Sequence, residues 1–425
     1  FADAHIHVEV YVYGSFLQTL MHRKGVRCSD CHDPHTAKLR AQGNSLCVRC
    51  HTPAKYDVES HHHHPAGSAG TQCVECHMPA RNYMVVDGRR DHSIRVPRPD
   101  VSLDLGTPNA CAGCHIDKKK SDQWKSYGAW LDAARAGETV AKEEVQRANQ
   151  WSADWIQRWF PDDKHRPRHF GYSLAAARRG TTRLPAEDEA FEESGAGSTA
   201  AAAHRSQEQA TIVADLARLA RDRVNAGPIV RATAVSHLEQ YPTPAAMAAN
   251  DAGLKDEEPM VRLAAVQNLD AFFPFRATDL WNLRNVPPGQ REGFRRQFDA
   301  LKERAVPRLS DSIRAVRMEA ARVLSVVPRM YLTDAEATAF DAALEEFYTG
   351  QKELDDQPGA HLAVGAVYGN LGQLDKAIAE YETAIKLDKE FVPARINLAL
   401  LYNYQGKNEQ AEKLLREAIE YAPEL

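Results

Sequence analysis

Eight cysteines and a set of closely spaced histidines are the residues of this sequence that could carry chemistry. All eight cysteines fall in four C-x-x-C-H motifs, so none is left for a disulfide or a catalytic nucleophile. Two thiols at this spacing add across the vinyl groups of a haem, and the adjoining histidine reaches the iron as its proximal ligand. The motifs therefore predict four covalently bound c-type haems, at Cys28, Cys31 and His32, at Cys47, Cys50 and His51, at Cys73, Cys76 and His77, and at Cys111, Cys114 and His115.

Zinc or a redox disulfide is the alternative use of such cysteine pairs, because C-x-x-C units are also good zinc half-sites. Neither requires a histidine directly after every second cysteine, so the repeated histidine favours haem. The first cysteines of successive motifs lie 19, 26 and 38 residues apart. Sequence this short cannot form an independent apolar core, and we expect the porphyrins to supply much of the buried surface.

Histidines outside the motifs are candidates for the second axial ligand of each iron. Nine of them occur within residues 1–95, which exceeds the need of four irons. This surplus favours ligation by two histidines, and hence electron transfer over substrate chemistry at an open iron. We expect at most two ligands from the run His61–His64. The predicted distal ligands are His35, His61, His64 and His92, with His22 and His7 as further candidates.

The bulk composition limits the class of protein. A length of 425 residues suggests two or three domains, and a net charge of −5 indicates neither nucleic acid nor an anionic membrane as a partner. No apolar run approaches the roughly 20 residues of a membrane helix, so no transmembrane segment is predicted. Covalent haem attachment takes place outside the cytoplasm. We therefore expect a periplasmic or extracellular protein, exported by a signal that this chain does not contain.

The sequence predicts a mostly α fold, in which a loop-rich multihaem cytochrome module at residues 1–120 is followed by an α-solenoid. Between them we expect a helical extension at 121–184 and an acidic, Gly- and Ala-rich linker at 185–205. The extension carries one face of tryptophans, at Trp151, Trp155 and Trp159. Such a stripe is far more often packing than an electron-hopping relay.

Two kinds of repeat follow the linker. The pattern V-R-x-x-A-x-x-x-L begins at Val230, Val261 and Val316 and resembles HEAT repeats, which we expect over 206–335, although an ordinary helical bundle would show the same stripe. Residues 340–425 are predicted to form tetratricopeptide repeats, with an array that is incomplete at Leu425. The period of 34 relates Tyr368, Gly372, Ala377 and Ala384 to Tyr402, Gly406, Ala411 and Ala418.

Long stretches of the chain are similar to a family of large exported multihaem cytochromes, related to the cytochrome c-554 and doubled-CXXCH group, that carry HEAT-like and tetratricopeptide repeats. Members have further C-x-x-C-H motifs upstream of the first stretch. The resemblance thus implies that this chain is a fragment or processed form. It also implies that an axial histidine here could serve an iron outside the chain, and that a haem here could depend on a histidine upstream or on another subunit. The similar stretches are Glu9–Gln18, Gly25–His35, Gly70–Pro79, Arg90–Asp100 and Gly106–Cys111.

Three functions are compatible with these features. The first is electron transfer along four closely spaced haems, with the solenoid binding redox partner proteins or copies of the chain; the solenoid could equally be a rigid spacer. The second is a multihaem oxidoreductase with one open haem acting on nitrite or hydroxylamine. The third is a subunit of an extracellular cytochrome filament. Residues 116–425 show no catalytic constellation and no phosphate-binding loop, so any chemistry is expected at the haems.

Overall fold

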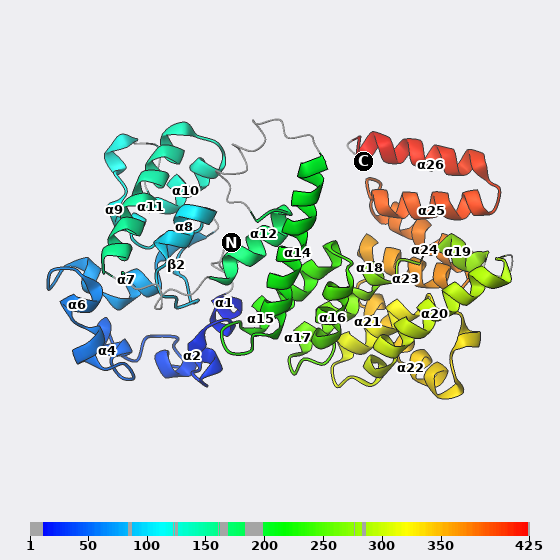
Figure 1. The fold of residues 1–425 in the computed structure, drawn as a ribbon, viewed down its shortest axis with the longest axis horizontal. Coiled ribbons are helices and arrows are strands. Elements are labelled where there is room, and N and C mark those ends of the chain that lie inside the picture. Colours follow the sequence, from blue (N-terminus) through cyan, green and yellow to red (C-terminus); the bar gives the residue numbers. More distant parts are fainter. Residues whose placement is uncertain are drawn as a thin grey trace. The chain divides into compact units, whose positions relative to one another are not determined.

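Most of the chain is helical in the computed structural model, and the predicted mostly α fold is confirmed (Figure 1). None of the helices in the described part is long and apolar enough to cross a membrane. The chain divides into two compact units, Phe1–His237 and Leu238–Leu425. The residues that the structure describes are 12–83, 87–121, 123, 126–159, 161, 169–182, 199–275, 277–282 and 286–423.

The division into units differs from the predicted domain limits. The boundary after His237 lies inside the predicted HEAT-like region, 206–335. Helix α14 (Thr199–Arg221) begins within the stretch expected as a linker. The predicted limits of the individual domains therefore stay predictions.

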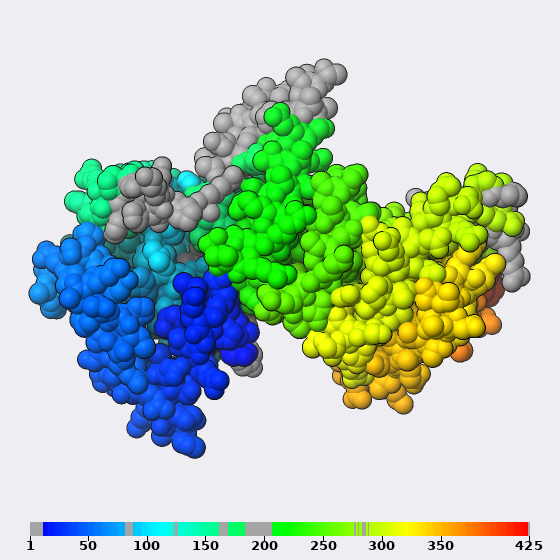
Figure 2. Space-filling view, turned by 60° about the horizontal axis from the view of Figure 1, so that its bottom comes forward, coloured from blue at the N-terminus to red at the C-terminus, as the bar shows by residue number. Residues whose placement is uncertain are grey.

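The first part of unit 1 is built from very short helices. Each C-x-x-C-H motif lies on, or begins at the end of, a single helical turn, which brings its cysteines and histidine to one side. Between Val12 and Arg98, Phe16 is the only described hydrophobic side chain that is buried. Figure 2 shows the start of this segment, in blue, at the surface. The helices are α1 (Val12–Leu17), α2 (Leu20–Arg23), α3 (Cys28–Cys31), α4 (Asn44–Cys47), α5 (Pro53–Tyr56), α6 (Glu59–His62) and α7 (Cys73–His77).

A β-hairpin separates the third motif from His92. Strands β1 (Ala80–Tyr83) and β2 (Asp87–Arg90) pair antiparallel, with Ala80 opposite Arg90. The N–H of Asp91 then donates to the Pro79 carbonyl at 3.1 Å, which extends the pairing by one residue on each side. The hairpin thus brings the chain back to a position beside the third motif.

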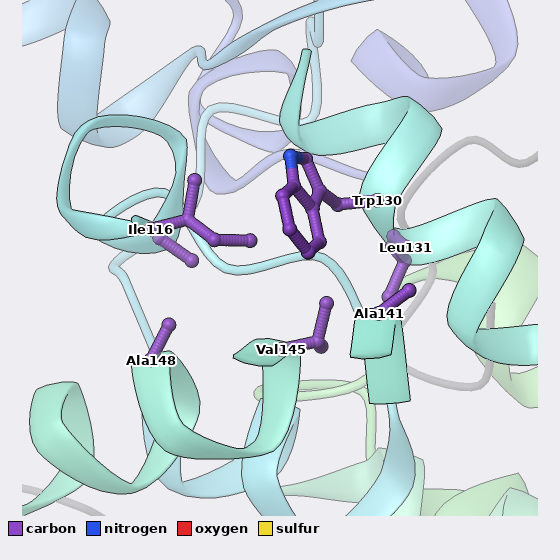
Figure 3. Packing of buried hydrophobic residues seen from close by; sticks show 7 residues of the cluster. Ile116, Trp130, Leu131, Ala141, Val145 and Ala148 are labelled. Carbon is purple, nitrogen blue, oxygen red and sulfur yellow. The ribbon is translucent and has the colours of Figure 1, made fainter. Parts of the chain in front are cut away.

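The fourth motif is packed against longer helices of unit 1. Trp130, which is fully buried, lies on α10 and points towards Ile116 and Val145, as Figure 3 shows. Ile116 follows the fourth motif directly, so this core anchors that motif where the earlier motifs have no comparable apolar support. The helices of this part are α8 (Pro99–Leu105), α9 (Ala112–His115), α10 (Tyr127–Arg135), α11 (Thr139–Trp159), α12 (Phe170–Arg179), α14 and α15 (Pro228–Ser236).

The repeat V-R-x-x-A-x-x-x-L begins helices α15, α17 and α21. Its valine, alanine and leucine are buried in all three repeats, as the stripe requires, although Leu238 and Leu269 lie just beyond the ends of α15 and α17. Its arginine has one recurring contact: the guanidinium donates to a carbonyl of the loop before its own helix. These contacts run from Arg231 to Ala226, from Arg262 to Asp256 and Glu257, and from Arg317 to Asp311. The arginine therefore fixes the entry of each repeat helix.

Unit 2 ends in two antiparallel helix pairs, α23 with α24 and α25 with α26 (Figure 1). Gly372 and Gly406 have φ of +72° and +77° at equivalent turns, a conformation that glycine adopts without strain. Ala377, Ala384, Ala411 and Ala418 are buried where the helices approach closely. The helices of unit 2 are α16 (Pro244–Gly253), α17 (Pro259–Gln267), α18 (Leu269–Phe272), α19 (Ala277–Trp281), α20 (Pro288–Ala305), α21 (Arg314–Leu324), α22 (Asp334–Lys352), α23 (Pro358–Asn370), α24 (Leu374–Leu387), α25 (Val392–Tyr404) and α26 (Asn408–Tyr421).

Candidate functional site

Three of the four motif histidines face a second histidine from another segment. The ring centroids of His32 and His92 are 6.3 Å apart, and those of His61 and His77 are 6.2 Å apart. Those of His64 and His115 are also 6.2 Å apart. When one iron is bound by two imidazoles on opposite sides, each metal–nitrogen bond is about 2 Å long and each ring adds half its width. The two ring centroids are then about 6 Å apart. Each pair therefore has the spacing that one iron between two histidines requires.

Hydrogen bonds fix the orientation of these rings. The Nδ1 atoms of His32 and His77 lie 2.8 Å from the carbonyls of Ala37 and Arg95. The Nδ1 of His92 lies 3.0 Å from the Arg90 carbonyl. A carbonyl accepts from an Nδ1–H, so these rings carry their proton on Nδ1 and leave Nε2 as a metal-binding atom. This is the tautomer that an axial ligand needs.

The remaining candidate histidines are placed differently. His51 packs edge-to-face on Tyr56 at 5.6 Å, and within the described residues no imidazole faces it at the spacing of the three pairs. His35 is exposed and does not face a motif histidine, and His22 packs on Phe16 at 5.5 Å. His7 lies outside the described residues.

The run His61–His64 supplies histidines to two different pairs. His61 faces the third motif and His64 faces the fourth, whereas His62 accepts the backbone N–H of His64 at its Nδ1 and His63 stacks on Trp159. Gly70 makes room for this arrangement. A Cβ at residue 70 would lie 2.2 Å from Cδ2 of His64. Sequence reasoning gave Gly70 no role, because the contact depends on the fold.

Hydrogen bonds hold neighbouring motifs together in their order along the chain. Arg49, in the second motif, donates to the carbonyl of Asp30 in the first at 2.8 Å. Asn44 joins the second motif to the third, because its side chain accepts from the N–H of Cys73 and donates to the Thr71 carbonyl, each at 2.9 Å. Tyr56 packs edge-to-face on both His51 and His61.

Helix α11, predicted to lie in an extension outside the module, forms one side of the fourth motif. Arg147 donates to the His115 carbonyl at 3.2 Å and pairs with the buried Glu144, which also accepts from the N–H of Asp117 at 2.8 Å. Burial alone would raise the pKa of Glu144, but the hydrogen bonds from Arg147, Lys120 and Asp117 outweigh it and lower the pKa to about 2. The carboxylate stays charged and ties the loop after His115 to α11.

A small pocket lies beside the third motif. It is lined by Cys76, His77, Pro79, residues 95–98, Pro108 and Ala110. Arg95 and Arg98 are in this lining; Arg98 forms paired hydrogen bonds with Asp100, the type of bond that an arginine also makes with a haem propionate. The prolines, the Cys76 thiol and the His77 imidazole of this lining fit the edge of a covalently bound haem.

The cysteines themselves do not resemble a zinc or thiolate site. Burial raises the pKa of Cys47 and of Cys111 to about 11. All eight cysteines are free of disulfides. In the described parts of the chain, no three His, Cys, Asp or Glu side chains converge as a metal-ion site would require.

Comparisons with known families identify two parts of the chain. The doubled CXXCH motif family matches residues 22–56, which contain the first two motifs. The TPR repeat matches 365–406 and the tetratricopeptide repeat matches 392–425, which confirms the predicted tetratricopeptide repeats at the end of the chain. No curated protein and no solved structure matches the chain. The doubled motif indicates covalent binding of haem c, and together with the repeats it supports a multihaem c-type cytochrome that carries tetratricopeptide repeats.

Proposed function

We propose that the chain is an electron-transfer protein with four c-type haems, one at each motif. Haem c, when bound, supplies one-electron redox chemistry at its iron. The observation that carries the proposal is the set of three histidine pairs at 6.2 to 6.3 Å. An iron held by two histidines has no open position for a substrate, which favours electron transfer. The proximal ligands are His32, His51, His77 and His115, and the distal ligands are His92 for the first haem, His61 for the third and His64 for the fourth.

The links between the motifs support a relay in sequence order. Hydrogen bonds join the first motif to the second and the second to the third, as described above. The third and fourth are joined because His61 and His64, three residues apart, face their respective histidines. We infer that electrons pass between neighbouring haems in the order of the motifs.

His51 favours a second candidate function. The ring beside His51 is that of Tyr56, whereas each of the other three motif histidines faces the imidazole of a second histidine. An iron with one histidine could bind a small molecule, so the second haem is the site at which an oxidoreductase of the nitrite or hydroxylamine type would act. His35, His22 and His7 are the competing distal ligands for this iron.

The C-terminal repeats support a protein-binding role. Tetratricopeptide repeats stack into surfaces that commonly bind proteins. We propose that the repeats of this chain, including the HEAT-like helices, bind a redox partner or another copy of the chain, the latter as in a cytochrome filament. Because c-type haems are attached outside the cytoplasm, we propose a periplasmic or extracellular location.

Haem content and ligation test the proposal. The chain would be produced in a host that matures c-type cytochromes, and its mass would be measured after denaturation. We expect the mass of four attached haems and low-spin signals from at least three of them in electron paramagnetic resonance. High-spin signals from the haems of the first, third and fourth motifs would contradict the proposal. A spectral change of one haem on adding nitrite or hydroxylamine would support the oxidoreductase.

A further inference from the structure

Three tryptophans of helix α11 form a continuous row of rings. The centroids of Trp151 and Trp155 are 6.2 Å apart, and those of Trp155 and Trp159 are 5.6 Å apart. The guanidinium of Arg158 lies 5.1 Å from the ring of Trp155. All three rings are half-buried, unlike Ala141 and Ala148 of the same helix, which are fully buried in the core. The row therefore does not belong to the apolar core that contains Ala141 and Ala148.

The two ends of the row contact the two segments that supply one histidine pair. Trp151 packs on His115 with centroids 4.3 Å apart. Trp159 stacks on His63 with centroids 4.1 Å apart and planes inclined by 7°. His63 directly precedes His64, the histidine that faces His115 at 6.2 Å. One rigid helix thus touches both sides of the fourth histidine pair.

We propose that Trp151, Trp155 and Trp159 are positioning residues that set the separation of His64 and His115 and so keep the fourth haem ligated by both. The inference rests on the proposed function, because it assumes an iron between these two histidines. Its physical basis is stiffness. An α-helix holds residues eight apart at a fixed distance, and stacked aromatic rings resist the rotation of their partners. The backbone at His63 has φ of +54°, a conformation that needs support from its surroundings.

The test uses the full haem-loaded chain with Trp159→Leu, Trp159→Phe and His63→Ala. Carbon monoxide binds a ferrous haem that has lost one axial ligand, so the fraction of haem that binds it reports on ligation. We expect Trp159→Leu and His63→Ala each to make one further haem bind carbon monoxide and to remove one low-spin signal. Trp159→Phe keeps a stacking ring, and we expect it to match the wild type.

Two controls separate ligation from general damage. Ser60→Ala changes an exposed side chain of α6 that does not touch the row, and Trp281→Leu removes a tryptophan of the second unit; neither is expected to change carbon monoxide binding. The proposal is overturned if His63→Ala and a folded Trp159→Leu bind no more carbon monoxide than the wild type. It is also overturned if the controls show the same increase. If the wild type itself lacks low-spin signals, the proposed function fails instead.

Discussion

His61 and His77 face each other with ring centroids 6.2 Å apart and planes inclined by only 12°. They come from α6 and α7, which are separate short helices, and the Nδ1 of His77 is held by the carbonyl of Arg95. This near-parallel pair is the clearest of the three candidate iron sites. It gives the most direct test of which histidine serves which motif.

Replacing His61 by alanine is expected to convert one haem from low spin to high spin. The distal ligand of the third haem is lost, whereas the pairs His32–His92 and His64–His115 are left in place. Electron paramagnetic resonance and carbon monoxide binding would measure the change. Ser60→Ala is the control, because Ser60 is an exposed neighbour of His61 on α6 and faces no motif histidine. Equal effects of the two variants would contradict the assignment.

Replacing Gly70 by alanine is expected to displace His64. The new Cβ would lie 2.2 Å from the His64 ring, so that ring must move and the fourth haem loses its distal ligand. The midpoint potential and spin state of one haem should change, as measured by redox titration followed in the visible spectrum. Gly293→Ala in α20 is the control, since a Cβ there meets nothing within 4 Å. An unchanged titration for Gly70→Ala would argue against His64 as a ligand.

Two alanine substitutions in α23 are expected to change stability in opposite directions. At Gly365 a Cβ would lie 2.6 Å from the ring of the buried Tyr381, and overpacking of this kind costs about 1–3 kcal/mol. At Gly359 a Cβ meets nothing, so alanine should stabilise the helix by about 0.5 kcal/mol or more. Urea unfolding followed by circular dichroism would measure both. Stabilisation by Gly365→Ala would show that α23 and α24 pack less closely than the structure indicates.

The buried ion pair between Arg262 and Asp311 predicts acid sensitivity of unit 2. The pair is bonded through two oxygens at 2.7 and 2.8 Å, and only 4% of the Asp311 side chain is exposed. Burial alone would raise the pKa of Asp311, but hydrogen bonds from Arg262 and the N–H of Ile313 outweigh it, so the pKa is lowered. A lowered carboxyl pKa stabilises the fold above the unfolded value of about 3.9, and that stability is lost as pH falls below it.

Asp311→Asn is therefore expected to destabilise unit 2 by about 3 kcal/mol near pH 7, because it leaves Arg262 buried without its counter-charge. The variant should also lose less stability than the wild type between about pH 5 and 3. Hydrogen–deuterium exchange of α17 and α21 would report both effects locally. Asp341→Asn is the matched control. Arg329 and Asp341 form an equally short pair at 2.7 Å, but half or more of each side chain is exposed, so solvent screens the pair and little loss of stability is expected.

Local spacing was sufficient to predict the motifs and the terminal repeats. A C-x-x-C-H motif needs only one helical turn, and a tetratricopeptide pair needs small residues and a glycine turn at a fixed period. The match to the doubled CXXCH motif supports haem c binding at the first two motifs, and the matches to the tetratricopeptide repeats confirm the terminal repeats. The predicted HEAT-like repeats have the expected stripe of buried apolar residues. They stay a prediction, because stripes of this kind occur in many helical bundles.

The pairing of the histidines was decided by tertiary structure. His32 faces His92, which follows the β-hairpin, and His61 and His64 face different motifs because of the turn between them. The sequence could supply the surplus of histidines but not their partners, since facing rings depend on chain segments far apart. The tryptophan face of α11 was visible as a pattern, but only the packed structure shows that it contacts both sides of the fourth pair. Residue types and short spacings are local properties, whereas an axial ligand is defined by where distant segments meet.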